Sequence, residues 1–270
     1  MGTSLLLGVG ASAGQGAIDN EITALQSAIT TYGTSFSNLV IGLSVGSKDL
    51  YRNSVAGFAS TGITGADPDV LVSYITQIRA ALKGTVLADV LIGHTDQRPA
   101  WVNSSNAALI NAVDWLGIDL QPFLDSTGGN GIQFGKTNFQ DEYDAVAAVS
   151  KGKPVWVTET GWPTSGVYGS GEGSTSNAKQ YWDDIGCALF GKTNTWWYNL
   201  YADVTSSPDW GVVYTNSTTL YDLSCGGTSP ELILSTPVKN ASIHLLNSSS
   251  ISFPITKLYG FLGAQPQLIF

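Results

Sequence analysis

Short apolar segments alternate with segments of helical spacing along most of this chain, and this alternation constrains the fold most. Apolar runs bounded by turn-forming residues predict strands, and apolar residues at i, i+3, i+4 and i+7 predict helices. The predicted strands cover residues 5–9, 39–45, 90–93, 115–119, 154–158 and 195–200, and the predicted helices cover 20–32, 67–82, 106–112, 138–149 and 176–190. This order predicts parallel βα units whose strands are buried on both faces.

The composition excludes several classes of protein. An apolar fraction of 43% is enough for a large core and excludes general disorder. The net charge of −9, from 12 Lys and Arg against 21 Asp and Glu, disfavours nucleic acid or an anionic membrane as a partner. No apolar run approaches about 18 residues, so we expect no membrane-spanning helix. No Cys/His cluster has metal-ligand spacing, so we expect neither a metal nor a cofactor.

Cysteines and glycosylation sequons bear on the compartment. Two cysteines and four N-x-[ST] sequons favour a secreted protein with one disulfide; these residues are Cys187, Cys225, Asn103, Asn216, Asn240 and Asn247. Unpaired core thiols are the alternative. Residues 1–13 contain an apolar stretch but no basic region, so we expect a buried strand there and no signal peptide. A secreted type of protein without a signal indicates a missing N-terminal piece.

Polar residues at the ends of the predicted strands are the candidates for a site, because active sites of parallel α/β proteins gather at the carboxyl ends of strands. Glu159 follows the apolar strand 154–158 and precedes Gly-Trp-Pro, with a structural ion pair as the alternative to a functional role. His94 follows the third strand and either lines a cleft or is structural. Alternation places one of Trp196 and Trp197 inward, as a sugar platform or as core.

The stretch around Glu159 carries a family resemblance. VTETGWPTSG is similar to the signature of glycoside hydrolase family 17, the β-1,3-glucanases. LLLGVGASAGQ, NLVIGLSVGSKDLYRNSV and GCALFGKTNTWWY resemble fungal members. The resemblance covers residues 1–225, which we take as one domain followed by a divergent tail at 226–270.

The resemblance implies a fold, a reaction and a set of site residues. It implies a TIM (β/α)8-type barrel, a secreted or cell-wall location, and retaining hydrolysis of β-1,3-glucan, with a monomer expected and no cofactor. Cys187 and Cys225 sit where such proteins carry a cysteine pair. Glu159 matches the nucleophile. The residues expected to contact substrate are His94, Asp119, Gln121, Trp162 and Trp197.

The chain departs from the family pattern at two site positions. Lys48 stands where the family carries its acid/base Glu. An ammonium group could donate a proton if burial lowered its pKa, but a neighbouring Glu159 would keep it charged. Asp49 is expected to point away, by alternation. Gln121 stands where related proteins tend to carry Tyr. We therefore expect weak or absent hydrolysis, with an inactive β-glucan-binding pseudoenzyme or a product that does not fold as alternatives.

A third departure concerns the barrel itself. The family barrel begins with two βα units before the segment that matches residues 5–9, so only strands three to eight are recognisable. We therefore predict an incomplete barrel with two open edges. The tail after residue 225 could cover one of them.

Overall fold

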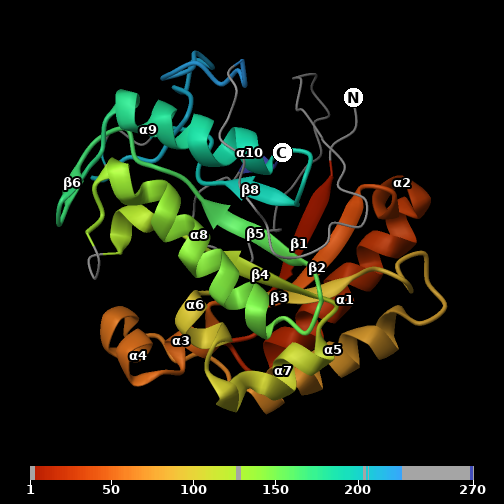
Figure 1. Cartoon of the computed structure of the whole chain (residues 1–270). Helices are drawn as coiled ribbons and strands as arrows, with labels where there is room; N and C mark the ends of the chain where they lie inside the picture. Colours follow the sequence, from red (N-terminus) through yellow and green to blue (C-terminus); the bar gives the residue numbers. More distant parts are fainter. Residues whose placement is uncertain (1–3, 126–128, 203–204, 206, 227–267, 270) are drawn as a thin grey trace. The chain divides into compact units, whose positions relative to one another are not determined.

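The computed structural model describes residues 4–125, 129–202, 205, 207–226 and 268–269 (Figure 1). The chain divides into two compact units. Where it is described, the first unit comprises residues 4–117 and 149–154, and the second comprises 118–148, 155–226 and 268–269. Residues 227–267 lie outside the described part, so the expected boundary at residue 225 stays a prediction.

Parallel strands form the centre of the first unit. Three of them are hydrogen-bonded in chain order: β1 (Leu5–Val9), β2 (Val40–Ser47) and β3 (Ile92–Asp96). Val9 lies opposite Val45, and Ser44 lies opposite Gly93. β4 (Trp115–Asp119) begins in this unit as the next neighbour of β3.

Helices separate these strands as the sequence predicts. The helices of the first unit are α1 (Gln15–Tyr32), α2 (Thr34–Ser37), α3 (Asp49–Arg52), α4 (Val55–Thr61), α5 (Pro68–Leu82), α6 (Arg98–Trp101), the 3₁₀ turn η1 (Ser104–Asn106) and α7 (Ala107–Ala112). α5 begins at Pro68 because proline suits the first helical turn, and it buries one apolar face that includes Leu71, Ile75 and Ile78. α1 lies alongside α5 (Figure 1), where Gln15 Nε2 donates to Gln77 Oε1 at 2.7 Å.

Strands and helices also alternate along the second unit. The strands here are the end of β4, β5 (Val155–Thr160), β8 (Thr195–Trp197) and β9 (Leu268–Ile269), with a separate hairpin of β6 (Val167–Tyr168) and β7 (Gly171–Glu172). β5 and β8 are parallel, and β9 pairs antiparallel with β8. The helices are the 3₁₀ turn η2 (Pro122–Leu124), α8 (Ile132–Val149), α9 (Thr175–Tyr181), the π-helical turn η3 (Trp182–Gly186) and α10 (Cys187–Leu189).

The predicted elements are confirmed in kind, and their ends differ for local reasons. The third strand was expected at residues 90–93 and lies at Ile92–Asp96, which places His94 inside the strand. The helix expected from residue 138 begins at Ile132, and Gly135 near its start lets it approach the rings of Trp162 and Tyr181. The short helices α3 and α4 and the β6–β7 hairpin were not predicted, because each is too short to show a periodic pattern. None of the helices in the described ranges is long and apolar enough to cross a membrane.

His94 and Asp96 form a buried polar pair in the first unit. Both side chains are fully buried, and the imidazole Nε2 lies 3.1 Å from Asp96 Oδ2 while Nδ1 lies 2.7 Å from the carbonyl oxygen of Val45. The backbone N–H of Leu50 also donates to Asp96 Oδ2 at 2.9 Å, which ties the start of α3 to β3. Burial lowers the pKa of His94, but the hydrogen bond and charge of Asp96, the charge of Asp49 and the Val45 carbonyl together raise it above 6.5.

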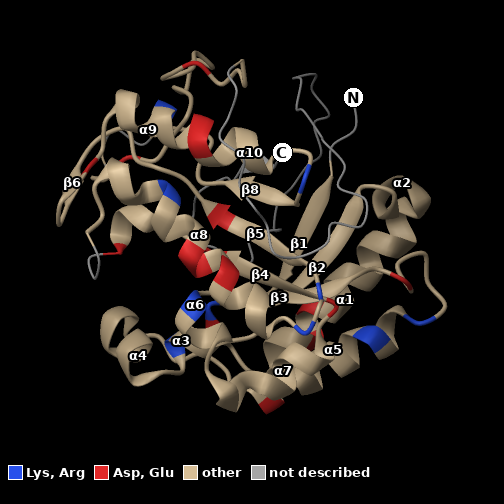
Figure 2. Ribbon diagram, viewed as in Figure 1, with Lys and Arg blue, Asp and Glu red and all other residues tan. Residues whose placement is uncertain are grey.

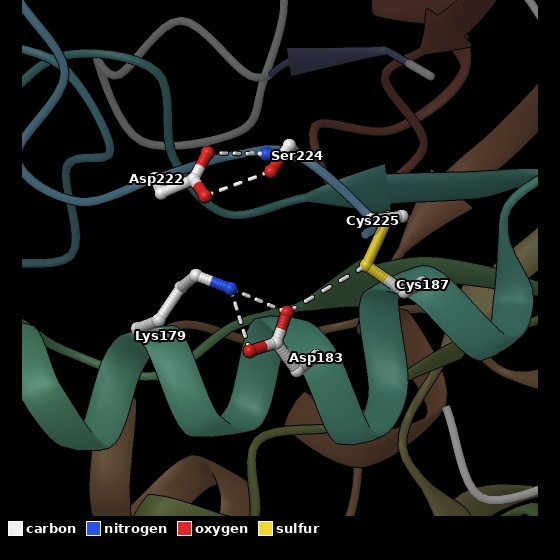
Figure 3. The surroundings of a disulfide bond; sticks show 6 residues. All are labelled: Lys179, Asp183, Cys187, Asp222, Ser224 and Cys225. Carbon is white, nitrogen blue, oxygen red and sulfur yellow. Dashed lines mark hydrogen bonds and ion pairs between the residues drawn. A yellow bond between two sulfur atoms is a disulfide. The ribbon is translucent and has the colours of Figure 1, made fainter. Parts of the chain in front are cut away.

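A disulfide joins two segments of the second unit. Cys187 and Cys225 are joined across a sequence separation of 38 residues. Figure 3 shows the bond next to an ion pair, in which Lys179 Nζ lies 2.5 Å from Asp183 Oδ2. Asp183 Oδ1 lies 4.0 Å from the Cys187 sulfur. The disulfide confirms the pairing that the resemblance implied, and it ties α10 to the segment that follows Tyr221.

Replacing His94 with Gln should remove part of the pH dependence of stability. Folding raises the pKa of His94, so protonated His94 stabilises the folded chain. This stabilisation is complete below the pKa in the unfolded chain, near 6.5, and it is lost as the pH rises through the pKa in the folded chain. The free energy of unfolding of the unaltered chain should therefore fall as the pH rises above about 6.5. Urea unfolding between about pH 5 and 9 measures this, and an identical pH profile in His94→Gln would contradict the assignment.

Replacing both Cys187 and Cys225 with Ala should lower the free energy of unfolding by about 4 kcal/mol, because the bond closes a loop of 38 residues in the unfolded chain. Urea unfolding of the double variant measures the loss. Dithiothreitol should bring the unaltered chain to the same midpoint and leave the variant unchanged. Equal midpoints for the oxidised chain and the variant would show that the disulfide does not raise the free energy of unfolding.

Candidate functional site

Three carboxylates stand at the carboxyl ends of otherwise uncharged strands. Figure 2 shows how few charged residues lie in the strands, and β3, β4 and β5 carry Asp96, Asp119 and Glu159 there. All three are buried. Because active sites of parallel α/β proteins form at this end of the strands, Asp119 and Glu159 mark where a site is to be sought in the second unit.

Glu159 is the next-to-last residue of β5 and is only 5% exposed. Gln121 Nε2 donates to Glu159 Oε1 at 2.7 Å. The backbone N–H of Leu120 donates to the Glu159 carbonyl oxygen at 2.7 Å, so the segment that leaves β4 is fixed to the end of β5. The residue that stands in place of the expected Tyr therefore contacts the predicted nucleophile and sets the direction of its carboxylate.

Asp119 joins this group from the last position of β4. It is 7% exposed, and Thr158 Oγ1 donates to its Oδ1 at 2.9 Å. Thr158 precedes Glu159 in β5. The second unit thus brings together Asp119, Gln121 and Glu159, three of the residues singled out from the sequence. Thr158 was not anticipated, because a threonine within a strand gives no signal beyond its β propensity.

Lys48 belongs to the first unit, directly after β2. Its backbone is left-handed, with φ 58° and ψ 24°, and its N–H donates to the Thr95 carbonyl oxygen at 2.8 Å. A non-glycine residue in this conformation is strained, and such positions cluster at functional sites. The half-buried side chain stands where β2 ends and α3 begins.

Asp49 has a structural role in the first unit. Its carboxylate is buried, accepts hydrogen bonds from Ser12 Oγ at 2.5 Å and from the Ser47 N–H at 2.7 Å, and lies 3.4 Å from Arg52 Nη2. These bonds engage both carboxylate oxygens. They hold the backbone on either side of Lys48.

The remaining predicted contacts lie in the packed interior. His94 has no exposed surface and both ring nitrogens have partners, which favours the structural alternative. Trp162 and Trp197 are also fully buried. Trp162 Nε1 donates to the Glu172 carbonyl oxygen at 3.0 Å, and the Trp197 ring lies 4.8 Å from that of Trp182, centroid to centroid. Both contacts favour packing over substrate binding.

No group of three or more His, Cys, Asp or Glu side chains within the described ranges is arranged to hold a metal ion. The chemistry open to these residues is that of carboxylates and amides. A buried carboxylate with a fixed orientation suits nucleophilic attack on a sugar, since retaining glycosidases use such a group.

Comparisons with known proteins identify the family. The model of the BtgE/BtgC glycoside hydrolase domain matches residues 2–212. A probable glucan endo-1,3-beta-glucosidase eglC of Aspergillus niger is 50% identical over 228 residues, which are 83% of this chain and 49% of that protein. This chain therefore spans about half the length of the curated relatives it matches.

Solved structures show the same fold. The glycoside hydrolase family 17 β-1,3-glucanosyltransferase from Rhizomucor miehei has a TM-score of 0.64 at 23% identity, covering 78% of this chain and 73% of that one. An active-site mutant of the Rhizomucor miehei β-1,3-glucanosyltransferase in complex with laminaritriose has a TM-score of 0.61 at 23% identity, covering 76% and 70%. The likeness confirms the predicted fold class. The family resemblance is confirmed by the family model and by the sequence relatives. The chain belongs to the BtgE/BtgC glycoside hydrolase domain family.

Proposed function

We propose that this domain binds β-1,3-glucan and cleaves it through a glycosyl-enzyme intermediate on Glu159, with slow turnover because Lys48 occupies the acid/base position. One observation carries the proposal: a buried Glu159 carboxylate held by the Gln121 amide at the carboxyl end of β5. The family membership and the glucanase names of the relatives support the substrate class.

The proposed reaction has two steps. The Glu159 carboxylate attacks the anomeric carbon while the bond to the leaving sugar oxygen breaks, and that oxygen must receive a proton. Water then attacks the same carbon, the ester to Glu159 breaks, and a base takes the proton of the water. Gln121 contributes by restricting the carboxylate to one direction, which lowers the entropy lost in reaching the transition state.

Lys48 weakens both steps. A lysine ammonium holds its proton more tightly than a carboxylic acid, and while charged it accepts none from water. General acid–base help contributes about 10²–10⁴-fold to the rate, which sets the size of the loss. Asp49 does not replace it, because its carboxylate is engaged by Ser12, Ser47 and Arg52.

A second candidate function is glucan binding without turnover, and the Lys48 substitution favours it. The buried carboxylates would then bind sugar hydroxyls. Titration with laminari-oligosaccharides in the absence of any cleavage would support this function.

We also infer a secreted or cell-wall location and a monomeric glycoprotein. The disulfide is typical of oxidising compartments. Asn103 and Asn216 are exposed, and each side-chain oxygen accepts a hydrogen bond from the hydroxyl of its own sequon, at 2.8 Å from Ser105 and 2.6 Å from Thr218. Asn240 and Asn247 lie outside the described residues.

Lys48→Glu should raise the rate of cleavage of linear β-1,3-glucan by about 10²–10⁴-fold, because it supplies the missing acid and base. Glu, like Lys, is unbranched at Cβ, so the left-handed backbone at this position tolerates both. Release of reducing ends measures the rate. Lys48→Gln is the matched control that removes the charge without adding a carboxyl group, and an equal rate in both variants would contradict the assignment of position 48.

An activated substrate should reveal Glu159 in the unaltered chain. Dinitrophenyl β-laminaribioside has a leaving group that needs no proton, so we expect a burst of dinitrophenolate equal to the enzyme concentration, followed by a slow phase. Azide needs no base and should accelerate the slow phase, giving a β-glycosyl azide. Glu159→Gln should abolish the burst. A folded chain that binds the sugar without a burst would establish the binding function instead.

A further inference from the structure

The β6–β7 hairpin of the second unit lies between β5 and α9 in the sequence (Figure 1). Its strands are only two residues each, with Val167 opposite Glu172 and Tyr168 opposite Gly171. An isolated two-stranded hairpin is marginally stable at best in water. A hairpin this short therefore depends on anchors outside its own strands.

Asn130 supplies the main anchor. The residue is 1% exposed, and its Nδ2 donates to the carbonyl oxygens of Phe123 at 2.5 Å and Tyr168 at 2.6 Å. Its Oδ1 accepts from the N–H and from the Oγ of Ser170, both at 2.9 Å. These bonds use the two donors and both lone pairs of the amide. The tip of the hairpin is thus locked to the segment that leaves β4.

Two further contacts hold the hairpin close. A Cβ at Gly171 would lie 2.9 Å from the Asn130 carbonyl oxygen and 3.0 Å from the Phe123 ring, so glycine permits the approach. Trp162 Nε1 donates to the Glu172 carbonyl oxygen at 3.0 Å. Phe123 and Trp162 are themselves fully buried. The hairpin backbone is therefore held against the buried side chains of Phe123 and Trp162.

Large apolar side chains remain exposed on the segments that Asn130 joins. Tyr168 is 46% exposed and Val167 71%, and Leu124 of η2 and Phe134 of α8 are each 41% exposed. Single exposed apolar residues need no explanation, but Tyr168 carries its exposed ring on a strand whose backbone is held by the buried Asn130 amide. An aromatic ring on a fixed backbone loses little entropy when it binds a ligand.

A chain of contacts links the hairpin to the proposed catalytic residues. Gln121, which contacts Glu159, lies two residues before Phe123, and Phe123 shares the Asn130 amide with Tyr168. A polysaccharide has sugar units beyond the one that reacts, and the apolar C–H faces of these units suit aromatic rings. We infer that Tyr168 is a platform for a glucose unit of β-1,3-glucan remote from Glu159. This inference rests on the proposed function and adds a subsite to it.

The test compares Tyr168→Ala with Tyr214→Ala in the full chain. Tyr214 is a matched control, because it is also 46% exposed and lies in a turn of the same unit. Calorimetric titration gives the Kd for laminarihexaose and laminaribiose. Tyr168→Ala should weaken hexaose binding about three- to tenfold and leave biose binding unchanged. Tyr214→Ala should change neither, and Tyr168→Trp should retain the affinity for hexaose.

The outcomes separate the two proposals. If the unaltered chain binds hexaose and Tyr168→Ala binds it equally well, the platform is wrong and the glucan function stands. If the unaltered chain binds neither sugar, the proposed function is wrong and the platform falls with it. Equal weakening of hexaose and biose would also overturn the inference, because a remote subsite acts only on the longer sugar. Matching melting temperatures of the two alanine variants show that folding is not the cause.

Discussion

Burying a carboxylate costs several kcal/mol unless hydrogen bonds replace the water it loses, and the described strands bury three at their carboxyl ends. The segment that follows β4 meets this requirement in the second unit by presenting the Gln121 amide to Glu159. β5 provides a hydrogen bond to the Asp119 carboxylate from the Thr158 hydroxyl. In the first unit the start of α3 donates its backbone N–H groups to Asp96. The loops after the strands are shaped by these bonds, and the same bonds give the carboxylates fixed directions.

The sequence was most informative where a long pattern repeats. The parallel strands, the long helices and the position of Glu159 at a strand end follow from hydrophobic periodicity and one motif. Contacts between residues far apart in sequence gave no such signal, and the role of Asn130 is an example. The exposure of Trp162 and Trp197 was equally hidden, since an aromatic residue next to a motif reads alike whether it packs inward or faces solvent. The ring contacts of Trp162 and Trp197 with Tyr181 show that both residues pack inward.

The turn that carries Lys48 is shaped by contacts of its neighbours in the sequence. Asp49 and its partners Ser12 and Arg52 hold the chain in the turn after β2, and the strained backbone of Lys48 is kept by those contacts. None of them requires a particular side chain at position 48. The turn can therefore keep its shape when the side chain at position 48 changes, which is why the proposed Lys48→Glu variant tests chemistry and not folding.

Asn130 also has a consequence for the chemical ageing of the protein, because Gly131 follows it. In an Asn-Gly pair the glycine backbone nitrogen attacks the side-chain carbonyl carbon and ammonia leaves, which forms a cyclic imide. Water then opens the imide and leaves a carboxylate in place of the amide. The folded chain opposes this reaction, since the amide nitrogen and oxygen are both held and buried. After unfolding the reaction proceeds, and the new carboxylate would face the Phe123 and Tyr168 carbonyl oxygens without a proton to donate. Deamidation at this position would thus record past unfolding and oppose the return of the hairpin to its place.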